Sequence, residues 1–261
     1  FFHQLVASQL DMDRLDYLKR DSFFTGVNEG AIGLDRIISM LHVVNDQIVV
    51  EEKGIYSIEN FLNARRLMYW QVYLHKASVS AEKMLINLIV RAKELASSGE
   101  QIFATEPFNL FLTNNITLED FQQNNSTLKT FGLLDDYDIW ASIKIWSKSS
   151  DKILRMLSNS ILNRELFGIE LTNQPLSKKS LAKLRLAVAD KFDLVKAEAR
   201  FLLAHGEVTN KAYIMEGEKI NILTKQGDVM DVAKAADLPN ITAMSKIVKK
   251  HYLCFPKTVT L

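Results

Sequence analysis

The chain has 261 residues, of which 48% are hydrophobic and 24% are charged, and this composition excludes a disordered or fibrous protein and favours one or two folded domains. Its 32 Lys and Arg residues nearly balance its 31 Asp and Glu residues, so no strong overall charge attracts nucleic acid or anionic lipid. A site for an anion must therefore be local.

The cysteine content and the hydropathy pattern predict the compartment. The single cysteine, Cys254, excludes an intramolecular disulfide and favours a reducing compartment, and its apolar neighbours predict a buried thiol. The sequence offers neither an apolar run of roughly 18 residues for a membrane span nor a signal peptide, so we expect a cytoplasmic protein. The chain begins Phe1-Phe2-His3 without a methionine, which favours a piece of a longer polypeptide.

The first two thirds of the chain carry mostly helical periodicity. Only 4 prolines and 10 glycines occur, which predicts a mainly α-helical fold. We expect a helix over residues 10–23 that stops at Thr25-Gly26, a short strand near 47–50 after a helical start at Leu34, and one long helix over 57–96. Further helices are predicted over residues 118–124, 135–148, 151–166 and 177–205, the last of them broken near Asp193.

The pattern changes after Gly206. Residues 212–215 and 219–224 alternate apolar and polar side chains, and a turn over 225–228 precedes 229–232, which predicts a small antiparallel sheet. A final helix over 241–251 and a strand over 252–255 are expected to follow. We therefore predict a mainly helical region over residues 1–209 and a small α+β region over 210–261.

The first segment that could carry chemistry is LDMDRLDYLKRD, residues 10–21. On a helix, Asp13, Tyr17 and Asp21 share one face because they are four residues apart. Carboxylate and phenol oxygens suit a hard divalent ion, and Arg14 could neutralise a phosphate. From spacing alone, a solvated helix face with ion pairs is the commoner explanation.

A second stripe consists of Arg65, Tyr69 and Tyr73, which are again four residues apart. An arginine flanked by aromatic rings suits a triphosphate with its sugar and base. The common alternative is an amphipathic helix whose arginine extends toward solvent.

The string SQLDMDRLDYLKRDSFFTGV, residues 8–27, is similar to the segment that closes the active site in HD-domain dNTP triphosphohydrolases. The resemblance covers roughly residues 5–171 and implies a partial HD-type helical fold. It also implies that Asp13 is the last aspartate of an H…HD…D metal set. The substrate residues that it implies are Arg14, Tyr17, Asp21, Arg65 and Tyr73. At the position of Tyr69 the vertebrate enzyme has a histidine, so this contact departs from the family pattern.

The same resemblance implies a regulatory nucleotide site and self-association. Vertebrate relatives bind a nucleotide between subunits, and the matching positions here are Arg36, Lys53, His75, Lys76 and Arg164, although each could be a surface charge. Gly168 and Glu51 stand where relatives have basic residues. We expect a homo-oligomer, either a dimer or a tetramer.

The rest of the metal set is absent from the sequence. None of the 5 histidines is followed by aspartate, so a divalent ion (Mg, Mn, Fe, Ni or Zn) would be held largely by residues outside this chain, and the chain alone is expected to be inactive. In the intact protein, we predict metal-dependent hydrolysis of a dNTP to a deoxynucleoside and triphosphate. The alternatives are a non-catalytic module for nucleotide binding and oligomerisation, and an HD phosphohydrolase for another phosphate ester. No membrane partner is expected, and nothing in the sequence supports a nucleic-acid partner.

Overall fold

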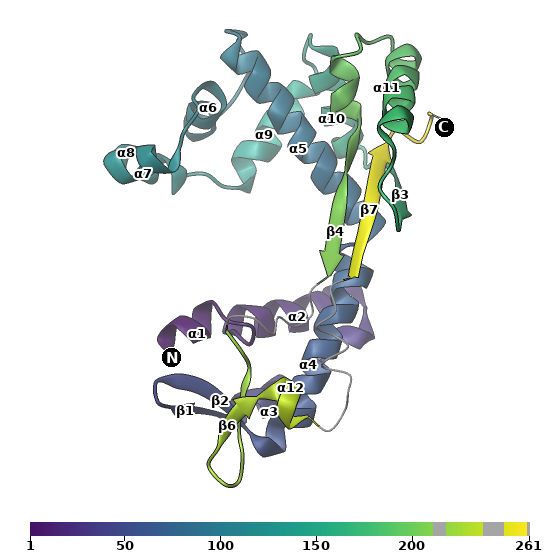
Figure 1. Cartoon of the computed structure of the whole chain (residues 1–261). Coiled ribbons are helices and arrows are strands. Elements are labelled where there is room, and N and C mark those ends of the chain that lie inside the picture. The colour runs from purple at the N-terminus through teal and green to yellow at the C-terminus, as the bar shows by residue number, and fades with distance from the viewer. Residues whose placement is uncertain (211–217, 237–247, 260–261) are drawn as a thin grey trace. The chain divides into compact units, whose positions relative to one another are not determined.

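The structure, a computed structural model, describes residues 1–210, 218–236 and 248–259. It is mainly helical with two small sheets, which confirms the predicted fold class. The backbone forms two compact units (Figure 1). Unit 1 comprises Phe1–His75 and Glu207–Lys250, and unit 2 comprises Lys76–Gly206 and His251–Leu261. The division into residues 1–209 and 210–261 stays a prediction.

Unit 1 combines helices with a four-stranded sheet of order β1-β2-β5-β6. Its helices are α1 (Phe2–Val6), α2 (Met12–Thr25), α3 (Leu34–Ser39), α4 (Ile55–Met68) and α12 (Val232–Ala235). Its strands are β1 (Leu41–Val44), β2 (Gln47–Glu51), β5 (Asn221–Leu223) and β6 (Val229–Asp231). The core between the helices and the sheet contains fully buried Leu18, Phe61 and Ile222.

Helix α2 begins and ends close to the predicted residues. The Asp11 side chain caps its first turn by accepting a hydrogen bond from the Arg14 backbone N–H at 2.7 Å. Gly26 ends it in the left-handed conformation, at φ 71°. Leu15 and Leu18 are buried against the core, which leaves the polar side chains of α2 on its other faces.

The sheet of unit 1 joins segments that are far apart in the sequence. Strands β1 and β2 form a hairpin whose turn residues Asn45 and Asp46 have φ values of 49° and 59°. The predicted strand at 47–50 is confirmed as β2, and it pairs in parallel with β5 through Val50 and Ile222. Strands β5 and β6 are antiparallel, as predicted, and their turn contains Gly227 at φ 92°. The predicted strand at 212–215 lies outside the described residues.

The prediction of one continuous helix over 57–96 is wrong. Helix α4 passes into a π-helical turn, η3 (Tyr69–Tyr73), in which the Leu74 backbone N–H donates to the Tyr69 carbonyl at 2.6 Å, and a new helix begins at Lys76. The hydroxyl of Tyr73 donates to Asp21 of α2. This tertiary bond favours the wider turn. The spacing of apolar residues gives no indication of the bond, because its two partners are 52 positions apart in the sequence.

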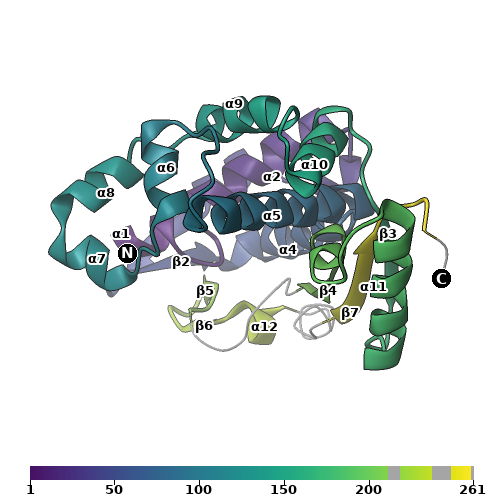
Figure 2. The ribbon, with the colours of Figure 1, turned by 90° about the horizontal axis from the view of Figure 1, so that it is seen from above.

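Unit 2 packs helices around α5 (Lys76–Ser97), with α10 (Lys152–Leu162) beside it (Figure 2). Its other helices are α6 (Glu106–Thr113), α7 (Leu118–Gln123), α8 (Asn125–Phe131), α9 (Asp136–Trp146) and α11 (Lys178–Phe192). A second sheet has the order β3-β7-β4, and unit 2 contains β3 (Gly168–Thr172), residues 204–206 of β4 (Ala204–Asn210) and residues 251–255 of β7 (Val248–Phe255). Leu88, Leu154 and Leu157 are fully buried between α5 and α10.

Several predicted boundaries in unit 2 need correction. Helix α10 ends at Leu162 and not at 166. Helix α11 ends at Phe192 and is followed by Asp193 in the left-handed conformation, which confirms the predicted break. Residues 198–202 form a 3-10 turn, η4 (Glu198–Leu202). Residues 248–251 of the predicted last helix belong to β7, because they continue a strand that pairs with β3. The other residues of that predicted helix, 241–247, lie outside the described residues.

The free thiol of Cys254 lies in the interior of unit 2. Cys254 is 1% exposed, as predicted, and burial raises the pKa of its thiol. Among the described residues, no helix combines the length and the apolar character that crossing a membrane requires.

Candidate functional site

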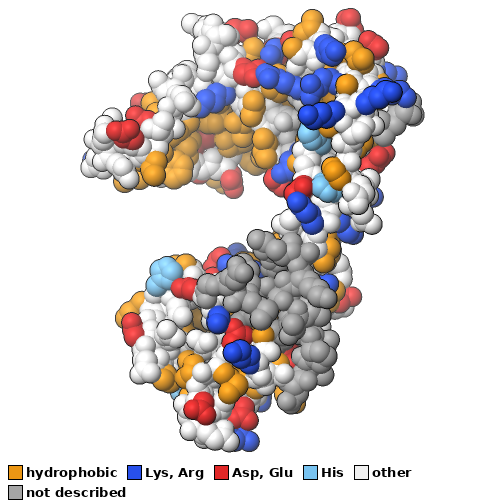
Figure 3. Space-filling view, viewed as in Figure 1, with side chains coloured by type: hydrophobic (Ala, Val, Ile, Leu, Met, Phe, Trp, Pro, Cys, Tyr) orange, Lys and Arg blue, Asp and Glu red, His pale blue; other side chains and the backbone are white. Residues whose placement is uncertain are grey.

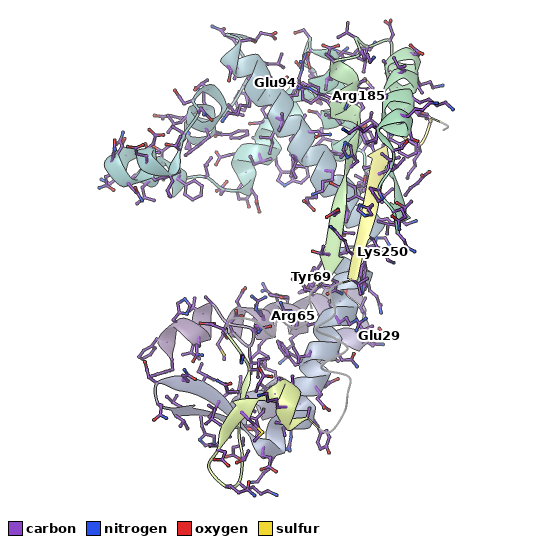
Figure 4. The ribbon with its side chains drawn as sticks, in the orientation of Figure 1. Glu29, Arg65, Tyr69, Glu94, Arg185 and Lys250 are labelled. Atoms are coloured by element: carbon purple, nitrogen blue, oxygen red, sulfur yellow. The ribbon has the colours of Figure 1, made fainter. Side chains whose placement is uncertain are left out.

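Two helical segments of unit 1 bring most of the predicted site residues together. Helix α2 carries Asp13, Arg14, Tyr17 and Asp21, and it packs against α4, which carries Arg65 near its C-terminal end. In Figure 4, Arg65 lies on the side of α4 that faces α2, with Tyr69 one turn further along the chain. We call the group formed by Tyr17, Asp21, Arg65, Tyr69 and Tyr73 the tyrosine wall.

Three tyrosine rings form the surface of the wall. The rings of Tyr17 and Tyr73 meet edge to face with centroids 5.8 Å apart, and those of Tyr69 and Tyr73 do so at 5.4 Å. The Tyr73 hydroxyl donates a hydrogen bond to Asp21 Oδ2 at 2.7 Å. This bond joins the π-helical turn to α2 and fixes the orientation of the carboxylate.

The environment keeps the phenol groups of Tyr17 and Tyr73 neutral. Burial raises the pKa of Tyr73 above its ordinary value, and the hydrogen bond to the Asp21 carboxylate raises it further. Burial also raises the pKa of Tyr17, although the positive charges of Arg65 and Arg14 oppose this shift. Both hydroxyls therefore stay protonated near neutral pH, and the Tyr73 hydroxyl, which donates its proton to Asp21, can still accept a hydrogen bond.

Arg65 is the most unusual group of the wall. The residue is only 5% exposed, and its Nε and Nη1 atoms are buried without a hydrogen-bond partner among the described residues. Its guanidinium carbon lies 5.9 Å from the centroid of the Tyr69 ring. A buried cation without an anionic partner is costly, because it loses its hydration and gains little in return. This arrangement is suited to an anion that approaches the wall.

Asp13 and Arg14 lie at the start of the same helix. Asp13 is exposed and precedes Tyr17 by one helical turn, so the two share a helix face. Arg14 donates from Nε to the Ser8 carbonyl at 2.8 Å and lies 3.1 Å from Asp11. Part of its hydrogen-bonding capacity is thus used within its own segment, and its role toward phosphate stays a prediction.

A metal site cannot be assembled from the described residues. No group of three or more His, Cys, Asp or Glu side chains in that part of the chain comes together in a way that could hold an ion. Asp13 by itself does not satisfy the coordination of a divalent cation. The residues present do not fit a complete metal site, and the role of Asp13 as a ligand stays a prediction.

The five predicted regulatory residues do not form one group within a unit. In unit 1, Arg36 Nη2 donates to the Lys53 carbonyl at 3.3 Å, so these two residues are neighbours. Lys53 Nζ lies 3.7 Å from Glu51. His75 also belongs to unit 1, whereas Lys76 and Arg164 belong to unit 2. Their role in nucleotide binding stays a prediction.

Sequence reasoning gave no role to Asp11, which is 3% exposed and caps α2. It accepts hydrogen bonds from the backbone of Ser8 and of Arg14, so it fixes the start of the helix that carries Asp13 and Tyr17. The predicted helix began at residue 10 and so included Asp11, whereas an aspartate three residues before the Arg14 N–H is a common N-cap and was the signal that could have identified it.

Comparisons with known proteins identify a matching family model and a similar solved structure. Residues 32–106, which include Arg65, Tyr69 and Tyr73, match the family model described as the HD associated region. The chain is 48% identical to a phosphohydrolase of Bacteroides thetaiotaomicron of known crystal structure, with a TM-score of 0.90, over 98% of this chain and 63% of that one.

Two curated relatives cover smaller parts. An uncharacterized protein of Bacillus subtilis, YwfO, is 36% identical over 62% of this chain and 36% of its own length. A deoxynucleoside triphosphate triphosphohydrolase SAMHD1 homolog of Dictyostelium discoideum is 29% identical over 39% of this chain and 20% of its own length. This chain therefore spans roughly a third or less of these two curated relatives. Together the matches support a relationship to HD-type phosphohydrolases.

Proposed function

We propose that the full-length protein is an HD-type phosphohydrolase that converts a dNTP to a deoxynucleoside and inorganic triphosphate. In this proposal, the present chain supplies the wall that binds the triphosphate and the sugar. The observation that carries the proposal is the buried Arg65, whose Nε and Nη1 donors lack a partner in the described structure. A phosphate oxygen would satisfy both requirements of this group, since it brings negative charge and accepts hydrogen bonds.

The neighbours of Arg65 suit the rest of the substrate. Tyr17 and Tyr73 present neutral hydroxyls, and Asp21 is a fixed carboxylate that can accept a hydrogen bond from the 3′-hydroxyl of a sugar. The relative from Dictyostelium, which is named a deoxynucleoside triphosphate triphosphohydrolase homolog, supports the choice of a dNTP. The relative from Bacteroides supports the broader class of phosphohydrolases.

The residues of this chain would act mainly by positioning and by neutralising charge. Arg65 would hold the triphosphate through donors that are already desolvated, so little reorganisation is needed when charge develops on the phosphate oxygens. Asp21 would orient the sugar, and through it the phosphate that is attacked by water.

The test is an assay of the full-length protein with each of the four dNTPs and Mg²⁺ or Mn²⁺, with and without GTP or dGTP. Chromatography of the products identifies the bond that is cleaved. We expect the deoxynucleoside and inorganic triphosphate. Binding without turnover would contradict the proposal in favour of a nucleotide-binding module, and release of pyrophosphate or faster cleavage of another ester would assign a different phosphohydrolase activity.

The sugar role of Asp21 can be tested separately. In the full-length protein, we expect Asp21→Asn to reduce the preference for a dNTP over the matching dideoxynucleotide by about tenfold in kcat/KM, since a charged acceptor is replaced by a neutral one. Asp16→Asn on the exposed face of α2 is the matched control and should leave the preference unchanged. An undiminished preference in Asp21→Asn would remove this residue from the sugar site.

A further inference from the structure

Unit 2 contains a cavity of about 410 Å³ that has no role in the function proposed above. Five segments line it: α5, α11, η4, β4 and β7. Four of its lining residues are basic, namely Lys83, Arg185, Arg200 and His205. The volume lies within the range of small-molecule sites, which extends from about 300 to 1,000 Å³.

The ionisable side chains that line the cavity include several basic residues. Of the described residues that line it, none is acidic. Two carboxylates reach its cations from elsewhere: Glu82 lies 2.5 Å from Lys83 Nζ, and Glu94 pairs with Arg200. Arg185 has neither a hydrogen bond nor an ion pair within the part of the chain that the structure describes. Lys and Arg side chains gather over this part of unit 2 in the upper right of Figure 3.

Tyr252 forms a defined wall of the cavity. A Cβ atom on Gly206 would lie 3.0 Å from the Tyr252 ring and from its hydroxyl, so glycine at this position lets the ring pack directly against β4. Lys83 Nζ lies 5.6 Å from the centroid of the same ring. Burial raises the pKa of Tyr252, so its hydroxyl stays protonated and can donate a hydrogen bond. The ring thus places an aromatic surface and a donor next to the cations.

We propose that this cavity binds an oligophosphate, either inorganic or as part of a nucleotide. Cations from separate elements line it, and an anion with several charged oxygens can contact more than one of them at once. Arg185, which is labelled in Figure 4, belongs to α11, whereas α5 contributes Lys83, Ile86 and Asn87 to the lining. Ile86 and Leu181 add apolar surface that could take a base.

The inference is independent of the proposed hydrolase function. All residues that line the cavity belong to unit 2, whereas the tyrosine wall belongs to unit 1. The residues that line the cavity also differ from the five residues of the predicted regulatory site. A test should therefore measure binding rather than hydrolysis, and it should remove the anion-binding capacity of Arg65.

The experiment is isothermal titration of the full-length Arg65→Ala protein with sodium triphosphate in the presence of EDTA, which prevents metal-dependent turnover. Adding Arg185→Gln should raise the Kd for triphosphate about five- to tenfold, because one charge-assisted contact is lost. Lys183→Gln on the same helix is the matched control. It also removes one positive charge, but Lys183 is exposed and does not line the cavity, so the Kd should change less than about twofold.

Two further measurements complete the test. Arg185→Lys should recover part of the affinity, since the charge is restored without the planar group. A parallel titration with dATP identifies the source of the oligophosphate: tighter binding than triphosphate assigns a nucleotide, and equal or weaker binding assigns an inorganic oligophosphate. Equal Kd values for Arg185→Gln and Lys183→Gln, or no binding at millimolar triphosphate, would overturn the inference. Arg185 is exposed, so these variants are expected to fold, which circular dichroism can verify.

Discussion

Replacing Arg65 with methionine should lower the kcat/KM of the full-length protein for its dNTP about 100-fold or more, while the free energy of unfolding stays the same or rises. The residue is 5% exposed, and two of its nitrogen donors lack partners in the described structure, so the folded chain gains little from the charge. Methionine keeps most of the volume and removes the cost of the buried cation. The loss of activity reflects the loss of a preorganised contact to phosphate.

Urea unfolding and steady-state kinetics on the same preparations test both halves of this prediction. Arg66→Met is the matched control, because Arg66 is the next residue of α4, is partly exposed and lies outside the tyrosine wall. It should change kcat/KM less than about threefold. If Arg65→Met instead destabilises the protein by about 2 kcal/mol or more and leaves kcat/KM unchanged, Arg65 is a structural residue and the main support for the proposed function is lost.

The helical spacing grouped the site residues within each of the two segments, although from spacing alone a solvated helix face was the commoner explanation. Asp13, Tyr17 and Asp21 are four residues apart on α2, and Gly26 ends that helix as its position in the sequence indicated. The spacing did not predict the contact between the two segments, because the bond from Tyr73 to Asp21 links residues 52 positions apart. Only the family resemblance placed both segments at one site.

Long-range pairing explains most of what the sequence did not predict. The π-helical turn at Tyr69–Tyr73 interrupts an apolar pattern that looks continuous, and β5 joins a sheet begun by β1 and β2 some 170 residues earlier. The Asn45-Asp46 turn was a local signal for the first hairpin, since such residues accept positive φ. The cavity around Arg185 had no comparable signal, because its basic residues come from segments between residues 83 and 205.

Unit 2 contains a charged network that fixes the start of α10. Asp151 caps that helix by accepting a hydrogen bond from the Leu154 backbone N–H at 2.7 Å. It also accepts two hydrogen bonds from Arg91 of α5, at 3.2 Å from Nε and 2.5 Å from Nη2. Glu198 lies 3.3 Å from the same guanidinium. The side chains of Arg91 and Asp151 are 14% and 12% exposed, so solvent screens their interaction only weakly.

Asp151→Ala should therefore lower the free energy of unfolding of unit 2 by about 3 to 5 kcal/mol at pH 7, because it removes both a helix cap and the main partner of a largely buried arginine. Burial alone would raise the pKa of Asp151, but the hydrogen bonds from Arg91 and Leu154 outweigh burial and lower it. The contribution of a carboxylate with a lowered pKa is complete above its unfolded pKa of about 3.9 and is lost as the pH falls through the lower folded value. In urea unfolding, the difference in the free energy of unfolding between wild type and Asp151→Ala should therefore have its full value at pH 7 and a smaller value at pH 3. The control Asp190→Ala, on the exposed side of α11, should change the free energy of unfolding little at either pH. A gap below about 1 kcal/mol at pH 7, or one that does not narrow in acid, would mean that the charge of Asp151 does not stabilise the junction between α5 and α10.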